Sequence, residues 1–128
     1  MKADITNFED IVWFVDSFYQ KVQSDELIGP VFDSVIVDWE PHLEKMYKFW
    51  NAALFGIQGF RGNPFARHAP LSLKKGHFER WLLLFNKTID EQYEGTMANE
   101  TKRRANMMAE MFLNRIQNMN GGHNRVIV

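Results

Sequence analysis

The sequence of 128 residues contains no cysteine. Disulfide bonds, thiolate metal sites and cysteine nucleophiles are therefore excluded. Long apolar runs are also missing, because the longest, residues 11–15 and 81–85, fall far short of the roughly 20 residues needed to span a bilayer. The first residues lead into an acidic, amphipathic segment instead of a signal-peptide apolar core, so we expect a cytoplasmic protein with no membrane partner.

Charge of one sign is not in excess either. Fifteen Lys and Arg residues balance 16 Asp and Glu residues, and the net charge is −1. With a pI of about 6.4, the chain lacks the basic surface expected of a general nucleic-acid binder. Hydrophobic residues at 45% and charged residues at 24% are ordinary values for a globular chain, and the length predicts a single domain over residues 1–128.

The common catalytic motifs are missing as well. The sequence has no Gly-x-Ser-x-Gly, no phosphate-binding loop, no dinucleotide fingerprint and no His-Glu-x-x-His. None of the four histidines follows a Glu by three residues, which excludes the usual ligand pattern of a di-iron helical bundle. The histidines and the aromatic residues remain as the candidates for chemistry.

Large apolar side chains are abundant, with 11 Phe, 4 Trp and 7 Met. Such residues suit a core that encloses a flat or irregular group. An aromatic-rich core with no such group explains the count equally well, so composition leaves both interpretations open.

The pattern of apolar residues predicts helices throughout and no strands. Thr6 and Glu9 form a candidate capping box for a first helix that ends near Ser24. A break at Gly29-Pro30 precedes a single helical turn. Asp38 is the expected cap of a second long helix, which ends at Gly56.

An irregular crossing follows over residues 56–72, where Gly and Pro are frequent and one short helical turn is expected at 65–68. Ser72 is the expected cap of a third long helix that reaches Gly95. A fourth is expected from about 97 to 119, ended by Gly121-Gly122, with 120–128 as a frayed tail. The predicted fold class is all-α, with four main helices and a core over about 7–119.

Four side chains stand out as candidates for a site. His42 shares a helix face with apolar residues, and His68 lies inside the irregular crossing. Tyr19 and Trp81 lie on the inner faces of the first and third long helices. A neutral imidazole on a short turn that faces a slot of Phe, Met and Trp is typical of a haem-iron ligand, but a solvent-edge or hydrogen-bonded core histidine fits this pattern as well.

Several short motifs, in this order and at these spacings, resemble the group III truncated haemoglobins over about residues 7–119. They are Phe18-Tyr19, Gly29-Pro30-Val31-Phe32, Trp39-x-x-His42, Phe49-Trp50, Gly62-Asn63-Pro64, His68-x-x-Leu71 and Phe78-x-x-Trp81-Leu82.

The resemblance implies a two-over-two helical sandwich that holds a b-type haem between its layers. By position, His68 corresponds to the proximal iron ligand, His42 to the histidine at the mouth of the distal pocket, and Tyr19 and Trp81 to the distal hydrogen-bond donors. Arg67 is the candidate partner of a haem propionate. The candidate residues of the haem wall are Phe32, Met46, Phe49, Trp50, Phe60, Leu71, Phe78 and Phe85.

The sequence departs from the family pattern at two positions. Phe60 stands where a tyrosine is expected, which removes a hydroxyl near the haem edge. A further histidine, His77, precedes Phe78, and its position near the start of a long helix favours a place at the pocket edge or surface over iron ligation. His123, in the Gly-Gly-His tail, is not expected to take part.

The function that the resemblance implies is binding of dioxygen, or another diatomic gas, at a pentacoordinate haem iron. A haem redox enzyme that acts on peroxide or nitric oxide is the alternative, and it would need an external reductase because the chain has no flavin motif. A helical interaction module without a cofactor is the third class, which the presence of His68, Tyr19 and Trp81 disfavours.

Overall fold

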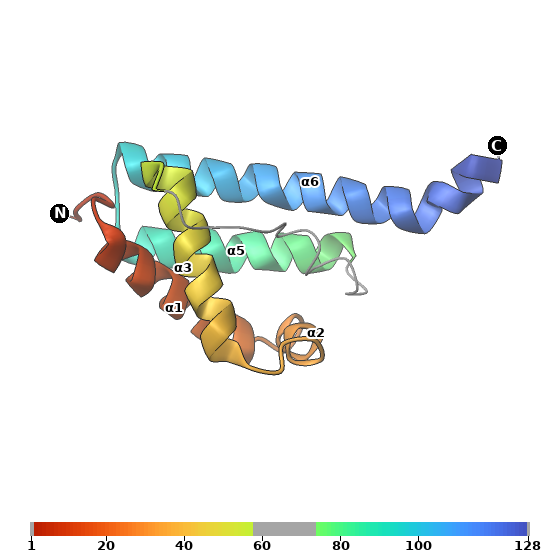
Figure 1. Cartoon of the computed structure of the whole chain (residues 1–128), viewed down its shortest axis with the longest axis horizontal. Coiled ribbons are helices and arrows are strands. Elements are labelled where there is room, and N and C mark those ends of the chain that lie inside the picture. Colours follow the sequence, from red (N-terminus) through yellow and green to blue (C-terminus); the bar gives the residue numbers. More distant parts are fainter. Residues whose placement is uncertain (1, 58–73, 128) are drawn as a thin grey trace.

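The computed structural model describes residues 2–57 and 74–127, with side-chain environments up to residue 115. Its helices are α1 (Phe8–Ser24), α2 (Gly29–Asp33), α3 (Trp39–Phe55), α5 (Lys75–Gln92) and α6 (Thr96–Ile127). Helix α1 packs against α2, α3 and α5, whereas α6 packs against α5 and α3. In Figure 1, α5 and α6 run side by side and α3 crosses them, as expected for two pairs of helices in two layers. The prediction of an all-α fold is confirmed.

The helix boundaries agree with most of the sequence signals. Asp38 caps α3 by accepting a hydrogen bond from the Glu40 amide at 3.4 Å, and Gly56 ends this helix in the left-handed conformation with φ of 67°. Glycine adopts that conformation without steric cost. The single turn predicted after the first helix is α2, although Gly29 and Pro30 begin this helix and do not precede it. A proline fits there because its missing N–H lies in the first turn.

Three predicted helix ends were wrong. The capping box of α1 is formed by Asn7 and Asp10 and not by Thr6 and Glu9, because the Asn7 side chain accepts from the Asp10 amide at 3.0 Å. At the other end of the chain, α6 continues through Gly121-Gly122 to Ile127. Glycine weakens a helix by about 1 kcal/mol relative to alanine but does not forbid it. Residues 58–73 lie outside the described residues. The N-cap of α5 is Lys74, so the prediction that Ser72 caps this helix was wrong.

The N-terminal segment caps α6 from a distant part of the chain. The Asp4 carboxylate accepts hydrogen bonds from the amides of Met97 at 2.9 Å and Ala98 at 2.8 Å. Burial raises the pKa of Asp4, but these backbone hydrogen bonds outweigh that effect and hold the pKa below its ordinary value. Gly95 has a φ of 132°, and a Cβ atom there would lie 2.6 Å from the Asp4 side chain. The tight approach of Asp4 therefore requires glycine at position 95.

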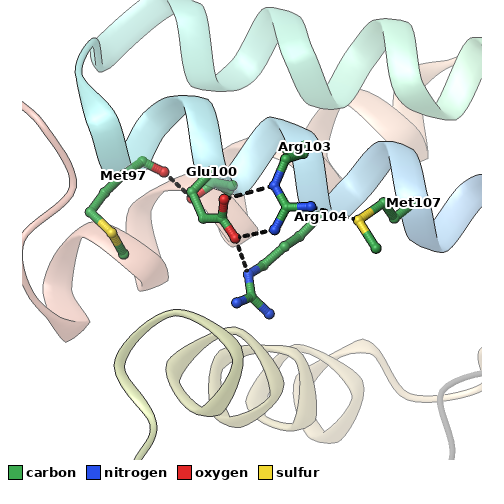
Figure 2. A network of polar contacts seen from close by, with 6 residues as sticks. Met97, Glu100, Arg103, Arg104 and Met107 are labelled. Atoms are coloured by element: carbon green, nitrogen blue, oxygen red, sulfur yellow. Dashed lines mark hydrogen bonds and ion pairs between the residues drawn. The ribbon is translucent and has the colours of Figure 1, made fainter.

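The basic run Lys102-Arg103-Arg104 on α6 is paired with acidic side chains. Lys102 contacts Asp90 at 2.7 Å, and both arginines contact Glu100, at 2.6 and 2.8 Å (Figure 2). The hydrogen bond from Arg103 is the largest influence on the Glu100 pKa, which falls to about 2. These exposed pairs largely neutralise the run, as expected of a solvated helix face.

The core is a column of aromatic rings between α1, α3 and α5. Phe14, Phe18 and Phe85 are fully buried, and Phe85 lies edge-on to both of the others, with ring centroids 5.9 and 5.1 Å apart. Trp50 of α3 completes the column, edge-on to Phe14 and stacked on Phe85. Within the described residues, no helix is both long and apolar enough to cross a membrane.

Asp25 joins α1, α2 and α5 at one point. Its carboxylate accepts hydrogen bonds from the amides of Leu27 at 3.0 Å and Ile28 at 2.9 Å, and it pairs with Arg80 at 2.8 Å. The Asp25 side chain is only 8% exposed, so its charge depends on these partners. Burial alone would raise the pKa of Asp25, but the partners hold it below its ordinary value.

We predict that Asp25→Ala lowers the free energy of unfolding by about 1–3 kcal/mol, because it leaves two amides and Arg80 without their acceptor. Urea denaturation at pH 7 measures the change. The exposed Asp33 of α2 provides the control, and Asp33→Ala should change the free energy by less than about 0.5 kcal/mol. Equal losses in both variants would contradict the role of Asp25.

The same contact predicts a pH dependence. A carboxylate with a lowered pKa in the folded state stabilises the fold above its unfolded pKa, and this contribution is lost as the pH falls through the folded pKa. The difference in free energy of unfolding between the parent chain and Asp25→Asn should therefore stay constant near neutrality and shrink below pH 3.8. A difference that persists unchanged into the acid range would show that charge is not what Asp25 contributes.

Candidate functional site

An apolar pocket lies among α1, α2, α3, α5 and α6. The empty space between its lining atoms, with the opening to solvent included, is about 680 Å³. The described lining residues are Val15, Phe18, Tyr19, Ile28, Phe32, Met46, Phe49, Trp50, His77, Phe78, Trp81, Phe85, Met108, Ala109 and Phe112.

Flat rings form much of the wall. Trp50 stacks on Phe85 with centroids 5.2 Å apart and planes 20° apart, and Trp81 stacks on Phe85 at 5.5 Å and 9°. Three nearly parallel rings thus bridge α3 and α5 along one side of the pocket. Surfaces of this kind favour a flat, largely apolar ligand.

Tyr19 and Trp81 reach the pocket from different helices. Tyr19 of α1 is buried at 5% exposure, and Trp81 of α5 is partly buried. Both lie against the ring of Phe18, with centroids 4.9 and 5.3 Å away. Burial raises the pKa of Tyr19, which keeps its hydroxyl protonated. The hydroxyl of Tyr19 and the indole N–H of Trp81 are therefore two donors that the fold brings to one cavity.

His42 lies behind Tyr19. It is buried at 6% exposure in α3, and its ring is edge-on to those of Tyr19 at 5.1 Å and Trp39 at 5.7 Å. His42 is not itself among the described lining residues of the pocket, whereas Tyr19, which it contacts, is. The ring centroids of Trp39 and Tyr19 are also 5.7 Å apart, so Tyr19, Trp39 and His42 form one cluster of three rings between α1 and α3.

His77 lies at the start of α5 and lines the same pocket. Its Nδ1 atom accepts a hydrogen bond from the Lys74 amide at 3.0 Å, which fixes the ring at the first turn of the helix. The sequence predicts a pocket-edge or surface position for His77, and its place in the lining agrees with the first of these.

Most of the site residues named from the sequence lie together. Eight of them line the pocket, namely Tyr19, Phe32, Met46, Phe49, Trp50, Phe78, Trp81 and Phe85. Four others lie outside the described residues, namely Phe60, Arg67, His68 and Leu71. No group of three or more His, Cys, Asp or Glu side chains that could hold a metal ion occurs within the described part of the chain.

Sequence reasoning missed part of the wall. Val15, Phe18, Met108 and Phe112 are recognisable as inward-facing from their helical spacing, but the spacing does not say whether an inward residue meets other core residues or a cavity. Ile28 gave no signal because it lies outside the predicted helices. Ala109 shares a helix face with Ala105 and Phe112, but its small side chain does not distinguish it. The α6 side of the pocket is thus known only from the structure.

Known proteins are similar to this chain over nearly its whole length. The family of bacterial-like globins matches residues 4–117. Group 3 truncated hemoglobin ctb from Campylobacter jejuni is 34% identical over 128 residues, which cover 96% of this chain and 100% of that protein.

Solved structures show the same fold. The crystal structure of a group III truncated hemoglobin from Campylobacter jejuni has a TM-score of 0.82 and 32% identity, covering 91% of this chain and 95% of the other. A cold-adapted truncated hemoglobin from the Antarctic marine bacterium Pseudoalteromonas haloplanktis TAC125 has a TM-score of 0.68 over 84% and 92% of the two chains, and at 18% identity it bears on the fold alone. In family, sequence and fold, this chain belongs to the group III truncated haemoglobins.

Proposed function

We propose that this chain binds a b-type haem in the apolar pocket and, with it, dioxygen or another diatomic gas. The observation that carries the proposal is the convergence of two donors, Tyr19 and Trp81, on a cavity whose other walls are largely apolar rings. The names of the relatives, which are haemoglobins, point to the same cofactor.

The residues of the pocket fit a haem. Phe32, Phe49, Trp50, Phe78 and Phe85 offer flat or apolar surface to a macrocycle, and Met46 adapts to its outline. Phe60 and Leu71, from the segment between α3 and α5, are the further proposed wall residues. A haem held there supplies an iron centre that binds diatomic gases reversibly.

The resemblance to the family assigns the two remaining roles in that segment. We take His68 as the iron ligand, through Nε2, and Arg67 beside it as the partner of a propionate. A haem held by His68 would supply an iron that can bind a gas molecule. His42 then holds Tyr19 in place through their edge-on contact.

Tyr19 and Trp81 determine which gas is held and for how long. A hydrogen-bond donor stabilises a ligand more strongly the more negative charge the ligand carries, so Tyr19 and Trp81 would favour dioxygen over carbon monoxide. The described lining is otherwise apolar except for His77 and the indole nitrogen of Trp50, and a hydrogen bond is stronger where water is excluded. Each donor can contribute about 1.5–3 kcal/mol, which corresponds to roughly ten- to a hundredfold slower release. Slow release suits retention or chemistry better than transport.

We predict that the purified, reduced protein shows a Soret band that shifts when carbon monoxide is added, and that His68→Ala loses or strongly alters this band. Absorption spectra of both proteins, reconstituted with equal haem, make the comparison. His123→Ala is the matched control, because it removes a histidine from the C-terminal end of the chain and should leave the spectrum unchanged. If haem addition to the parent protein gives no Soret band, the proposed function is wrong.

We further predict that Tyr19→Phe releases dioxygen about ten- to a hundredfold faster, with a smaller change for carbon monoxide. Stopped-flow measurement of both dissociation rates tests this. Tyr93→Phe is the control, because the Tyr93 hydroxyl contacts Asp10 and that ring does not belong to the described pocket wall. An unchanged rate of dioxygen release in Tyr19→Phe would show that Tyr19 is not the donor.

A further inference from the structure

Four side chains of the described pocket wall carry a nitrogen or oxygen atom, namely Tyr19, Trp50, Trp81 and His77. Trp50 belongs to the stacked rings of the wall, on Phe85. Tyr19 and Trp81 meet at Phe18, whereas His77 precedes Trp81 by four residues on α5, one helical turn nearer the start of this helix. The exposed Lys74 and Lys75 adjoin it in the sequence. His77 therefore marks a polar edge of the pocket, separate from the two donors at Phe18.

The hydrogen bonding of His77 fixes the position of its proton. Nδ1 accepts from the Lys74 amide at 3.0 Å, so this nitrogen carries no hydrogen. The neutral ring then has its proton on Nε2, which is a donor. Within the described residues, no acceptor is recorded for Nε2. The hydrogen bond that anchors the ring thus leaves one N–H free to serve a ligand.

The same geometry argues against His77 as an iron ligand. A histidine that binds a metal through Nε2 donates its Nδ1–H to a neighbouring acceptor. In His77, Nδ1 instead accepts a hydrogen bond from the Lys74 amide, so it cannot carry the proton that such a ligand donates. Ligation through Nε2 would place two N–H groups face to face or break the contact at the start of α5.

We propose that Nε2–H of His77 donates a hydrogen bond to a propionate carboxylate of the bound group, so that His77 positions the haem in the pocket. This inference rests on the proposed function. The macrocycle is flat and apolar and carries its carboxylates along one edge. The pocket has apolar rings and the donor His77, which follows the exposed Lys74 and Lys75 in the sequence. An ionised carboxylate is the acceptor that such a donor binds most strongly.

The contribution of this hydrogen bond is measured by comparing the parent chain with His77→Asn, each loaded either with haem b or with its dimethyl ester. His77→Asn keeps an acceptor, Oδ1, near the place of Nδ1 for the Lys74 amide, but its side chain is too short to reach where Nε2 lies. Haem b and its dimethyl ester differ in the charge of the propionates. The measurement is the rate at which each haem passes from the protein to an excess of an apoglobin acceptor.

We expect His77→Asn to lose haem b about tenfold faster than the parent chain, and both proteins to lose the dimethyl ester at the same rate. Equal rates for haem b, or a difference that persists with the ester, would overturn the role of His77. Loss of the Soret band in His77→Asn, with His68→Ala unaffected, would make His77 the iron ligand and also overturn it. If the parent chain binds neither haem, the proposed function itself fails, and this outcome is distinct because no Soret band forms.

Discussion

The ring of Phe18 joins the core of the fold to the wall of the pocket. It is 2% exposed, and it lies edge-on to Tyr19, Trp81 and Phe85, with centroids 4.9 to 5.3 Å away. Edge-on aromatic pairs contribute about 0.5–1.5 kcal/mol each beyond the burial of their surface. The contacts that stabilise α1 against α5 are therefore the contacts that set the separation of the two donors. In this fold, the position of the site and the packing of the core depend on the same side chain.

Much of the fold could be predicted because its signals are local. Asp38 and Gly56 define α3, and both act within one turn of the helix they bound. The start of α1 was harder to predict, because the sequence offers two candidate capping boxes one residue apart, Thr6 with Glu9 and Asn7 with Asp10. Only the backbone conformation decides which of them forms. Asp4 caps α6 from more than 90 residues away, and a contact of this kind has no local pattern. The prediction that α6 ends at Gly121-Gly122 was wrong because a pair of glycines lowers helix propensity but does not by itself end a helix.

The site could be predicted in part. Tyr19, Trp81 and six wall residues were found because the family resemblance names them by position, and the structure brings them to one cavity. Helical spacing marked Met108 and Phe112 as inward-facing, but their place in the wall depends on how α6 packs on α5. The direction of the hydrogen bond at His77 is likewise a matter of three-dimensional geometry. Sequence identifies the residue types of the site, whereas tertiary packing decides which of them share a surface.

The central claim is that the pocket between the helix pairs is a haem site, and a titration of the haem-free chain with haem tests it most directly. Trp50 and Trp81 line the pocket, so a haem bound there must quench their fluorescence by energy transfer. The account predicts quenching that ends sharply at one haem per chain, in step with a saturating Soret band. A gradual decline in fluorescence with no endpoint, together with a Soret band that does not saturate, would contradict the claim that the pocket is a haem site.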